Sequence, residues 1–396
     1  MFKVKLASIL IILVCLVSCN HIDRQMENMI IQSLDAAFVQ YKQMAVSLVD
    51  KPELLPRSFN HKGEFITCKS DWWVSGFFPG ALWYLYEYSG DEQMKKLAEE
   101  YTARVEDQQY TTNNHDVGFM IYCSFGNGYR LTNNGHYKDV ILTAANSLAT
   151  RYRPSTGVIR SWDWGTWQYP VIIDNMMNLE LLFFASHNPD YKKLGNIAVS
   201  HAEKTLANHF RPDGSSFHVV SYDTVTGAVI SQQTRQGYSD ASAWARGQAW
   251  GLYGYTMCYR ETGDKKYLEQ AQKIADFILN HPNLPEDKIP YWDFDDPDIP
   301  DTYRDASAGA IICSALIELS RLSDKEINRK YLKVAKKQLK SLSSEPYRAK
   351  PGTNGNFLLM HGVGSKPENS EADVPLTYAD YYYIEAMMRY KQLKGF

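Results

Sequence analysis

The sequence predicts one all-α domain, an (α/α)6 six-hairpin toroid, behind a short N-terminal leader. Three observations lead to this prediction: a helical-hairpin pattern that recurs five times, two further helices at the ends of the chain, and long connections between successive hairpins. Although 396 residues exceed a usual domain length, we expect a single domain because the hairpins form one closed ring.

Residues 1–18 are typical of a processing signal. They contain two lysines, an apolar run over 6–17, and the start of the tetrapeptide Leu-Val-Ser-Cys that ends at Cys19. This lipobox pattern predicts cleavage before Cys19 and acylation of its thiol, although an ordinary signal peptide with an incidental cysteine looks similar. We therefore expect residues 19–396 to form the mature domain. Asn20 in place of aspartate favours the outer membrane, so we expect a periplasmic or outer-membrane lipoprotein of a Gram-negative bacterium.

Each repeat combines an aromatic-rich apolar helix, a short turn with Gly, Asn or Asp, and a Lys-rich amphipathic helix. The first helix of each pair is apolar around most of its surface and is predicted to be inner, whereas the second is predicted to be outer. The helices near 25–48 and 377–393 would form the sixth hairpin, because an open solenoid would leave an uncovered apolar end. The five copies span 81–101, 119–152, 179–210, 250–279 and 311–339.

The connections between hairpins are long, which in a compact domain commonly indicates function. They should all emerge at one end of the ring and form a single cleft, with a short β-hairpin within 211–235 lining it. The connections cover 59–78, 105–118, 153–173, 211–243, 281–308 and 341–376.

Composition narrows the possible functions. The 27 Tyr, 9 Trp and 16 Phe make up 13% of the chain, and such rings suit either a carbohydrate cleft or a large helical core. Loss of the leader removes two lysines and no acids, so the formal charge changes from -3 to -5, which argues against nucleic acid as a partner. Four cysteines follow Cys19; their spacing suggests no metal site, and the apolar settings of the last three suggest free thiols without disulfides.

Asp116 and Asp174 are the residues most suggestive of catalysis. Each precedes a predicted apolar helix, so N-capping is the simpler explanation for both. Asp174 nevertheless follows Val-Ile-Ile, and Asp116 follows His115 in a loop with two asparagines, so partial burial is expected. Two carboxyls in an aromatic-walled cleft can acquire separated pKa values, one protonated and one charged.

Arg246 lies in the segment WARGQAW, between Trp244 and Trp250. We expect the two rings to clamp its guanidinium and offer it to an anionic ligand. His218 and Gln236 are candidate hydrogen-bonding partners, although each by itself is as compatible with a structural role. No serine nucleophile motif, phosphate loop or metal-spaced histidine cluster is present in the sequence.

Five segments of the chain resemble the unsaturated glucuronyl hydrolases, glycoside hydrolase family 88. They are NHDVGF, VIIDNMMNLELL, SAWARGQAWGLYGY, YRDASAGAI and ADYYYIEAM, in this order, within a resemblance that runs from Trp73 to Met387. The resemblance implies a six-hairpin α/α barrel, which agrees with the repeat count. It also implies hydrolysis, without a metal or organic cofactor, of oligosaccharides that carry a 4,5-unsaturated uronic acid at the non-reducing end.

In the reaction that the resemblance implies, an acid protonates C4, water adds at C5, and the hemiketal collapses to release the sugar. Asp174 matches the family's general acid/base, and Asp116 matches its second essential aspartate. The uronate carboxylate is expected to meet Arg246 and Gln236. The substrate-binding positions that match the family are Trp73, His115, Trp162, His218, Gln236, Trp244, Arg246 and Trp250, with Trp164 or Trp167 as substitutes for Trp162.

The chain departs from this pattern before its last helix. Some members that favour sulfated glycosaminoglycan disaccharides carry Ser-x-Ser-x-Lys there, whereas Ser365 and Lys366 are adjacent here. This departure argues against a preference for sulfated substrates, and chondroitin, hyaluronan, heparin-type and other uronate fragments all remain possible. Two other functions remain as alternatives: an unsaturated rhamnogalacturonyl hydrolase that acts on pectin fragments, and a glycan-binding lipoprotein without catalysis.

Overall fold

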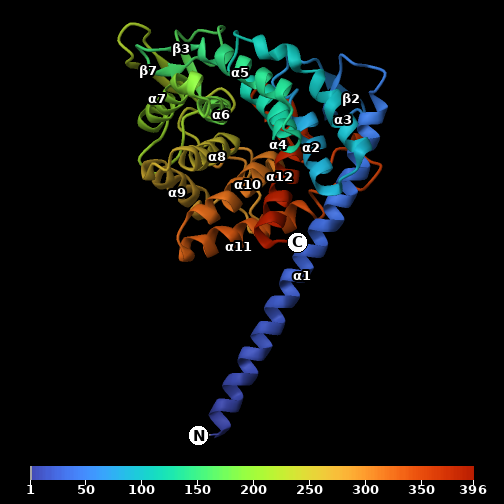
Figure 1. The fold of residues 1–396 in the computed structure, drawn as a ribbon. Coiled ribbons are helices and arrows are strands. Elements are labelled where there is room, and N and C mark those ends of the chain that lie inside the picture. Colours follow the sequence, from blue (N-terminus) through green and yellow to red (C-terminus); the bar gives the residue numbers. More distant parts are fainter. Residues whose placement is uncertain (1) are drawn as a thin grey trace.

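The computed structural model describes residues 2–396, with side chains from Arg24 onward. A helical ring forms the body of the molecule, and the N-terminal end of α1 (Phe2–Ser47) projects away from it (Figure 1). The lipobox lies outside the residues whose side chains are described, so the leader and the lipid anchor at Cys19 stay predictions. Within the described part of the chain, no helix combines the length and apolarity needed to span a bilayer.

Six inner elements form a closed ring. Each contacts the next, and α12 returns to contact α2, so no apolar end is left open. This ring confirms the closed toroid predicted from the repeats. The inner elements are α2 (Phe77–Ser89), η2 with α4 (Gly118–Gly126, Asn127–Thr132), η3 with α6 (Ile173–Asn178, Leu179–Ser186), α8 (Ala245–Thr262), α10 (Ala306–Leu322) and α12 (Thr377–Lys394).

The outer helices each pack against an inner partner. The α1 helix pairs with α12 as the predicted sixth hairpin, and the Tyr41 hydroxyl donates to Oδ2 of Asp380 across this contact at 3.0 Å. Inner α10 is buried from Ala306 to Ile317, whereas α11 alternates buried and exposed positions, as expected of an outer helix. The outer helices after α1 are α3 (Glu92–Ala103), α5 (Gly135–Ala149), α7 (Lys192–Asn208), α9 (Lys265–Asn280) and α11 (Lys325–Leu342).

The Gly-Asp pairs in the repeats explain the tight hairpin turns. Gly90 and Gly263 end α2 and α8 in the left-handed conformation, at φ 65° and 69°, where a side chain would be strained. The following residues, Asp91 and Asp264, accept a backbone N–H from the first turn of the next helix. Each pair therefore stops one helix and starts another, and each aspartate cap is worth about 1 kcal/mol.

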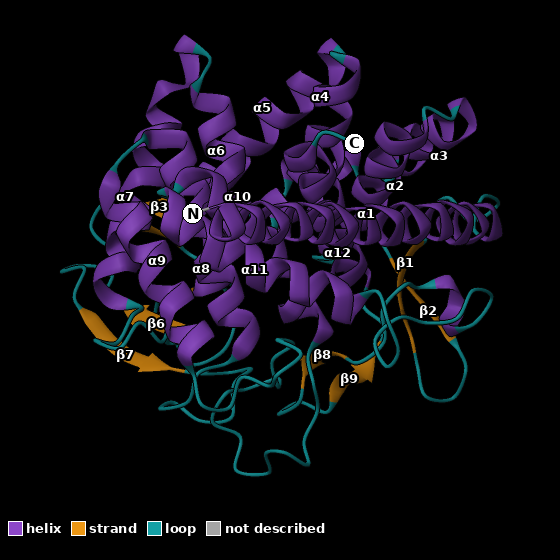
Figure 2. Ribbon diagram, turned by 90° about the horizontal axis from the view of Figure 1, so that it is seen from below, coloured by secondary structure: helices purple, strands orange, loops and turns teal. Residues whose placement is uncertain are grey.

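The strands and long connections gather at one end of the ring, whereas short hairpin turns occupy the other (Figure 2). The hairpin expected within 211–235 is present as β6 and β7, and β5 extends it to a three-stranded antiparallel sheet. The strands are β1 (Leu55–Phe59) with β2 (Phe65–Cys68), β3 (Tyr152–Arg153) with β4 (Val158–Ile159), β5 (Pro170–Ile172) with β6 (Val219–Tyr222) and β7 (Val229–Gln233), and β8 (Gly362–Ser365) with β9 (Ser370–Val374).

The four cysteines after Cys19 are free thiols, as predicted: Cys68, Cys123, Cys258 and Cys313.

Short 3-10 segments occur in two of the long connections and in the turn between α6 and α7. They are η1 (Glu106–Tyr110), η4 (Pro189–Tyr191) and η5 (Asn354–Asn356).

Candidate active site

A cleft of about 350 Å³ opens among the long connections, at the N-terminal ends of the inner elements. It brings together both predicted catalytic carboxyls and five of the predicted substrate-binding residues. Those seven are Trp73, His115, Asp116, Trp162, Asp174, Gln236 and Arg246. The other three, His218, Trp244 and Trp250, are buried behind the cleft wall.

The two aspartates are placed by a close contact between η2 and η3. The backbone N–H of Phe119 donates to Oδ1 of Asn178 at 2.9 Å. Gly118 approaches so closely that an added Cβ would lie 2.6 Å from the same oxygen, so only glycine fits there. Asp116 lies two residues before this contact on one side, and Asp174 lies four residues before Asn178 on the other.

Neither aspartate serves as a helix cap. The first residues of η2 and η3 receive no side-chain capping hydrogen bond, so the simpler explanation considered for Asp116 and Asp174 does not hold. The Asp174 side chain is 11% exposed, and that of Asp116 is 21% exposed. Both carboxyls are therefore largely removed from water, as the sequence led us to expect.

Burial gives both carboxyls raised pKa values. Desolvation raises the pKa of Asp116 to about 7, against a lowering by the charge of Arg151. Desolvation also raises the pKa of Asp174 to about 6, opposed by His115 and Arg246 and reinforced by Asp116. A proton is thus retained in this pair close to neutral pH, as donation to a substrate requires.

Although the pKa of Asp116 is the higher of the two, Asp174 is the better placed of the pair to give a proton to a substrate. Its side chain is less exposed than that of Asp116, and its Oδ2 has no hydrogen-bond partner among the described residues. Burial lowers the pKa of the neighbouring His115 to about 4, so this imidazole is uncharged at neutral pH. An uncharged His115 does not lower the pKa of Asp174, so this effect is absent at neutral pH.

The two histidines flank the aspartates. Nε2 of His115 lies 3.4 Å from Oδ1 of Asp116, and its backbone N–H donates to the carbonyl of Ser161 at 3.0 Å. His218 reaches Asp174 from behind, because the antiparallel pairing of Ile172 with Val219 brings β5 and β6 together. The Nε2 atom of His218 lies 3.8 Å from Oδ2 of Asp174.

Two tryptophans form one aromatic wall of the cleft. Trp162 and Trp164 stack with centroids 4.6 Å apart and ring planes 10° apart, and both line the cleft. Trp167 contacts Trp162 edge-on, and its Nε1 donates to Gln233. Of the two substitutes considered for Trp162, Trp164 therefore shares the wall, whereas Trp167 supports it.

On another side of the cleft, Trp73 packs edge-on against Phe77 and Phe119.

The surroundings of Arg246 differ from those expected. Its guanidinium lies over Trp244 at 4.4 Å, but the second ring is that of Tyr378 at 5.5 Å, because Trp250 faces away and packs against Phe119 and Tyr382. Nη1 lies 3.5 Å from Oδ2 of the fully buried Asp305.

Two backbone carbonyls of β8 accept hydrogen bonds from Arg246. Its Nη atoms donate to the carbonyl oxygens of Val363 and Gly364. Gln236 is fixed to the same strand, since its Nε2 donates to the Gly364 carbonyl at 3.3 Å. Arg246 thus borders the cleft with much of its hydrogen-bonding capacity already used.

Charged residues at the mouth of the cleft were not predicted. Arg57 donates to Glu371 at 2.8 Å and lies over Trp72 at 4.4 Å. Arg235 pairs with Glu368 and lies over Trp164 at 4.2 Å. These residues belong to β1, to the connection after β7 and to the β8–β9 hairpin, and no sequence pattern relates them.

Ser365 and Lys366 separate in space although they are adjacent in sequence. Ser365 lines the cleft, whereas Nζ of Lys366 donates to Oδ2 of Asp296 at 2.8 Å and lies over Trp292 at 5.0 Å. Lys366 is therefore directed into a separate cluster. Across residues 24–396, no three His, Cys, Asp or Glu side chains gather closely enough to hold a metal ion.

Comparisons with known proteins point to one group of enzymes. The family model described as Glycosyl Hydrolase Family 88 matches residues 51–394. An unsaturated glucuronyl hydrolase of Formosa agariphila is 49% identical over 342 residues, which are 85% of each chain. A crystal structure of an unsaturated glucuronyl hydrolase specific for heparin aligns with a TM-score of 0.91 and 48% identity, covering 93% of this chain and 99% of that one.

A more distant structure holds a sugar. It is a variant of the Streptococcus agalactiae unsaturated glucuronyl hydrolase in complex with dGlcA-GalNAc6S. It aligns with a TM-score of 0.77 and 30% identity, and covers 91% of both chains.

Proposed function

We propose how this cleft works from one premise: the chain belongs to Glycosyl Hydrolase Family 88. It is an unsaturated glucuronyl hydrolase, which removes a 4,5-unsaturated uronic acid from the non-reducing end of an oligosaccharide by hydrating the C4=C5 enol ether. The proposal assigns the steps of this reaction to individual residues and names a substrate class.

Asp174 acts as the general acid. Its neutral carboxyl donates a proton to C4, which leaves an electron-poor C5 next to the ring oxygen. Water then adds its oxygen to C5, and the Asp174 carboxylate takes up the proton that the water loses. The hemiketal formed at C5 opens the sugar ring, and the hemiacetal at C1 then releases the remaining saccharide. The carboxyl ends the cycle protonated, as it began.

Asp116 completes the acid/base pair. Because like charges disfavour one another, an ionised Asp116 would help Asp174 to keep its proton.

The rings of Trp162 and Trp164 offer a stacking surface to the sugar. The uronate carboxylate is assigned to Gln236 and Arg246, which both line the cleft. The observation that carries this assignment is the pair of buried carboxyls with raised pKa values in one sugar-sized cleft.

The substrate class that we propose is a heparin-type disaccharide. The strongest support is the 48% identity and the TM-score of 0.91 to the heparin-specific enzyme. Lys366 is engaged by Asp296 and does not line the cleft, so the sulfate-binding Ser-x-Ser-x-Lys arrangement expected of other members is absent. Arg57 and Arg235 at the mouth provide cations at different positions.

The cellular location that we propose follows from residues 1–19 alone. Export and acylation at Cys19 would place the enzyme on a membrane, where it would meet oligosaccharides released by polysaccharide lyases.

The decisive experiment follows the ultraviolet absorbance of the C4=C5 double bond in lyase-generated disaccharides. Wild-type protein should bleach this absorbance, fastest with heparin-type disaccharides. Asp174→Asn should slow bleaching by about 10²- to 10⁴-fold while it retains binding, because the amide cannot supply the proton. Full activity of Asp174→Asn would refute the acid assignment, and faster turnover of chondroitin-type disaccharides would refute only the substrate class.

A further inference from the structure

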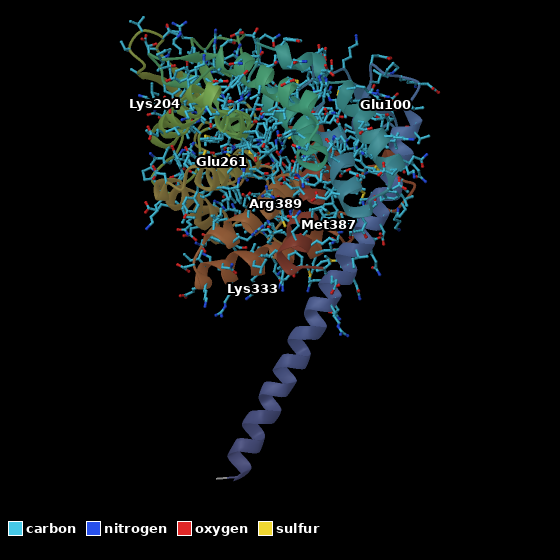
Figure 3. The ribbon with its side chains drawn as sticks, in the orientation of Figure 1. Glu100, Lys204, Glu261, Lys333, Met387 and Arg389 are labelled. Atoms are coloured by element: carbon cyan, nitrogen blue, oxygen red, sulfur yellow. The ribbon has the colours of Figure 1, made fainter. Side chains whose placement is uncertain are left out.

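A second cavity, of about 370 Å³, lies within the ring. Except for Gly118 and Phe119 at the start of η2, its walls come from positions further along the inner elements than the cleft, which lies at their N-terminal ends. Figure 3 shows Arg389, a lining residue of this cavity, within the ring, whereas Lys204 and Lys333 lie at its outer edge. We call this space the axial cavity. The reaction assigned to the cleft makes no use of it.

A layer of aromatic rings separates the axial cavity from the cleft. Phe119 borders the axial cavity and packs against Trp73, a lining residue of the cleft, with ring centroids 5.6 Å apart. Phe119 also packs against Trp250 at 5.2 Å, and Trp250 packs against Tyr382 at 5.5 Å. A molecule in the cleft therefore does not extend into the axial cavity.

Aromatic side chains dominate the walls of the axial cavity. Phe184 lies between Tyr122 and Tyr129, with centroid distances of 5.6 Å to each. Tyr381 and Tyr382 face them from α12. Such rings present apolar faces for stacking together with polar hydroxyl edges, which suits a ligand with the same two kinds of surface.

The charged groups of the axial cavity are already neutralised. Arg130 binds both carboxylate oxygens of Glu87, at 2.9 and 2.7 Å. Arg389 pairs with Glu318 at 2.7 Å. Glu385 accepts hydrogen bonds from Tyr84 at 2.9 Å and from Tyr253 at 3.0 Å. A charged ligand would have to displace one of these partners, which is costly at a buried site.

Some hydrogen-bonding capacity nevertheless remains unused. In the part of the chain with described side chains, the hydroxyls of Tyr122 and Tyr129 make no hydrogen bond. Stacking faces, unused hydroxyls and a balanced charge favour a ligand with an apolar face, a rim of hydroxyl groups and no net charge. We propose that the axial cavity is a second carbohydrate site that binds an uncharged saccharide of one or two units.

The test uses full-length Asp174→Asn protein with its cleft saturated by unsaturated disaccharide, so that only a second site is free. Saturation-transfer NMR and calorimetry would probe binding of N-acetylglucosamine and of its β-1,4-linked dimer, with glucuronic acid as the charged comparison. Both uncharged sugars should bind, and glucuronic acid should bind at least about tenfold more weakly. This readout does not depend on catalysis.

Two further substitutions locate the binding. Tyr122→Phe removes an unused hydroxyl but keeps the ring, and Phe184→Leu removes a stacking ring but keeps an apolar side chain. Each should raise the Kd of N-acetylglucosamine by about three- to tenfold. Tyr110→Phe, at a residue that is 68% exposed and outside both cavities, is the matched control and should leave the Kd unchanged.

Binding that disappears when the cleft is filled would overturn the proposal. So would a Kd that neither Tyr122→Phe nor Phe184→Leu changes, or the absence of binding by both uncharged sugars. Tyr122→Phe removes no internal hydrogen bond, so a folded protein is expected for this test.

Discussion

Nε2 of His218 lies 3.8 Å from Oδ2 of Asp174, and neither atom has a hydrogen-bond partner among the described residues. Nδ1 of the same ring accepts the backbone N–H groups of Arg235 and Gln236, at 3.0 and 3.1 Å. Nδ1 is therefore unprotonated, and the proton of the neutral imidazole is on Nε2. Burial holds the pKa of His218 well below its usual value, so the ring stays neutral and directs an N–H toward Asp174.

The first prediction concerns this N–H, which makes His218 a positioning residue for Asp174. His218→Ala should lower kcat/KM by about 10- to 100-fold, the value of the hydrogen bond to a charged group that forms when these two atoms close from 3.8 Å during the reaction. It should also move the alkaline limb of the pH profile to higher pH, because a donor that favours the carboxylate is lost. His187→Ala, at a side chain that is 68% exposed, is the control. An unchanged alkaline limb would show that His218 only supports the fold.

The second prediction concerns the pH dependence of activity. Burial raises the pKa of Asp174 to about 6 and that of Asp116 to about 7. A general acid acts only while protonated, so kcat/KM should fall as the pH rises through this range. Initial rates of ultraviolet bleaching, measured from about pH 5 to about pH 9, give the profile. Activity that increases steadily across the same range would contradict proton donation by this pair.

The third prediction concerns stability and rests on the same raised pKa. A carboxyl whose pKa is higher in the folded than in the unfolded state stabilises the fold at low pH, and this contribution is lost as the pH rises through the folded value. For Asp116 the loss occurs between about 4 and about 7. Asp116→Asn keeps the shape without the charge, so it should raise the free energy of unfolding at about pH 8 by up to about 4 kcal/mol.

The gain from Asp116→Asn should shrink at about pH 5, where the wild-type carboxyl is itself neutral. Denaturant unfolding at the two pH values measures both effects. An equal gain at both would mean that charge burial at Asp116 is not the cause. Activity should fall in the same variant, since functional sites commonly carry such a cost in stability.

The sequence predicted the ring and much of the site because both depend on local patterns. The Gly-Asp turns at Gly90 and Gly263 fix where inner helices end, and Asp116 and Asp174 stand out as carboxyls within apolar segments. The pairing of Arg246 with Asp305 was not predicted. Arg246 lies on α8 and Asp305 directly precedes α10, so the two meet only through the packing of these helices and not through a local sequence pattern.

The orientation of Trp250 was missed for a related reason. Trp250 follows Arg246 by four residues, which suggested that both side chains lie on the same face of the helix. The Trp250 ring instead packs against Phe119 and Tyr382 in the interior of the toroid. Spacing along a helix does not determine which neighbour a side chain meets.

The fourth prediction concerns Arg246 and Asp305, which are 1% and 0% exposed. Arg246→Ala would leave the Asp305 carboxyl buried without its cation, so we expect a loss of about 3–5 kcal/mol in the free energy of unfolding. In Arg246→Met with Asp305→Asn, both charges are removed, and most of this stability should return. Chemical denaturation of the single and double variants measures the difference. A single variant as stable as wild type would show that the two charges are not coupled.

The fifth prediction concerns the arginines at the mouth of the cleft. Glu368 pairs with Arg235, whose guanidinium lies over Trp164. Glu368→Gln removes the competing carboxylate and leaves Arg235 available to a sulfate on the second sugar of the substrate. The KM for a sulfated heparin-type disaccharide should therefore fall by about two- to fivefold, the range expected for an exposed ion pair. The KM for its unsulfated counterpart should hardly change.

This effect of Glu368→Gln should weaken as salt is added, because the charges involved are partly exposed. Glu286→Gln is the matched control. The Glu286 side chain is 97% exposed, lies outside the cleft and also forms an ion pair, with Lys337. Arg235→Ala should act in the opposite direction and raise the KM for the sulfated disaccharide. If the variants at Glu368 and Arg235 change the KM for sulfated and unsulfated disaccharides equally, Arg235 does not recognise sulfate.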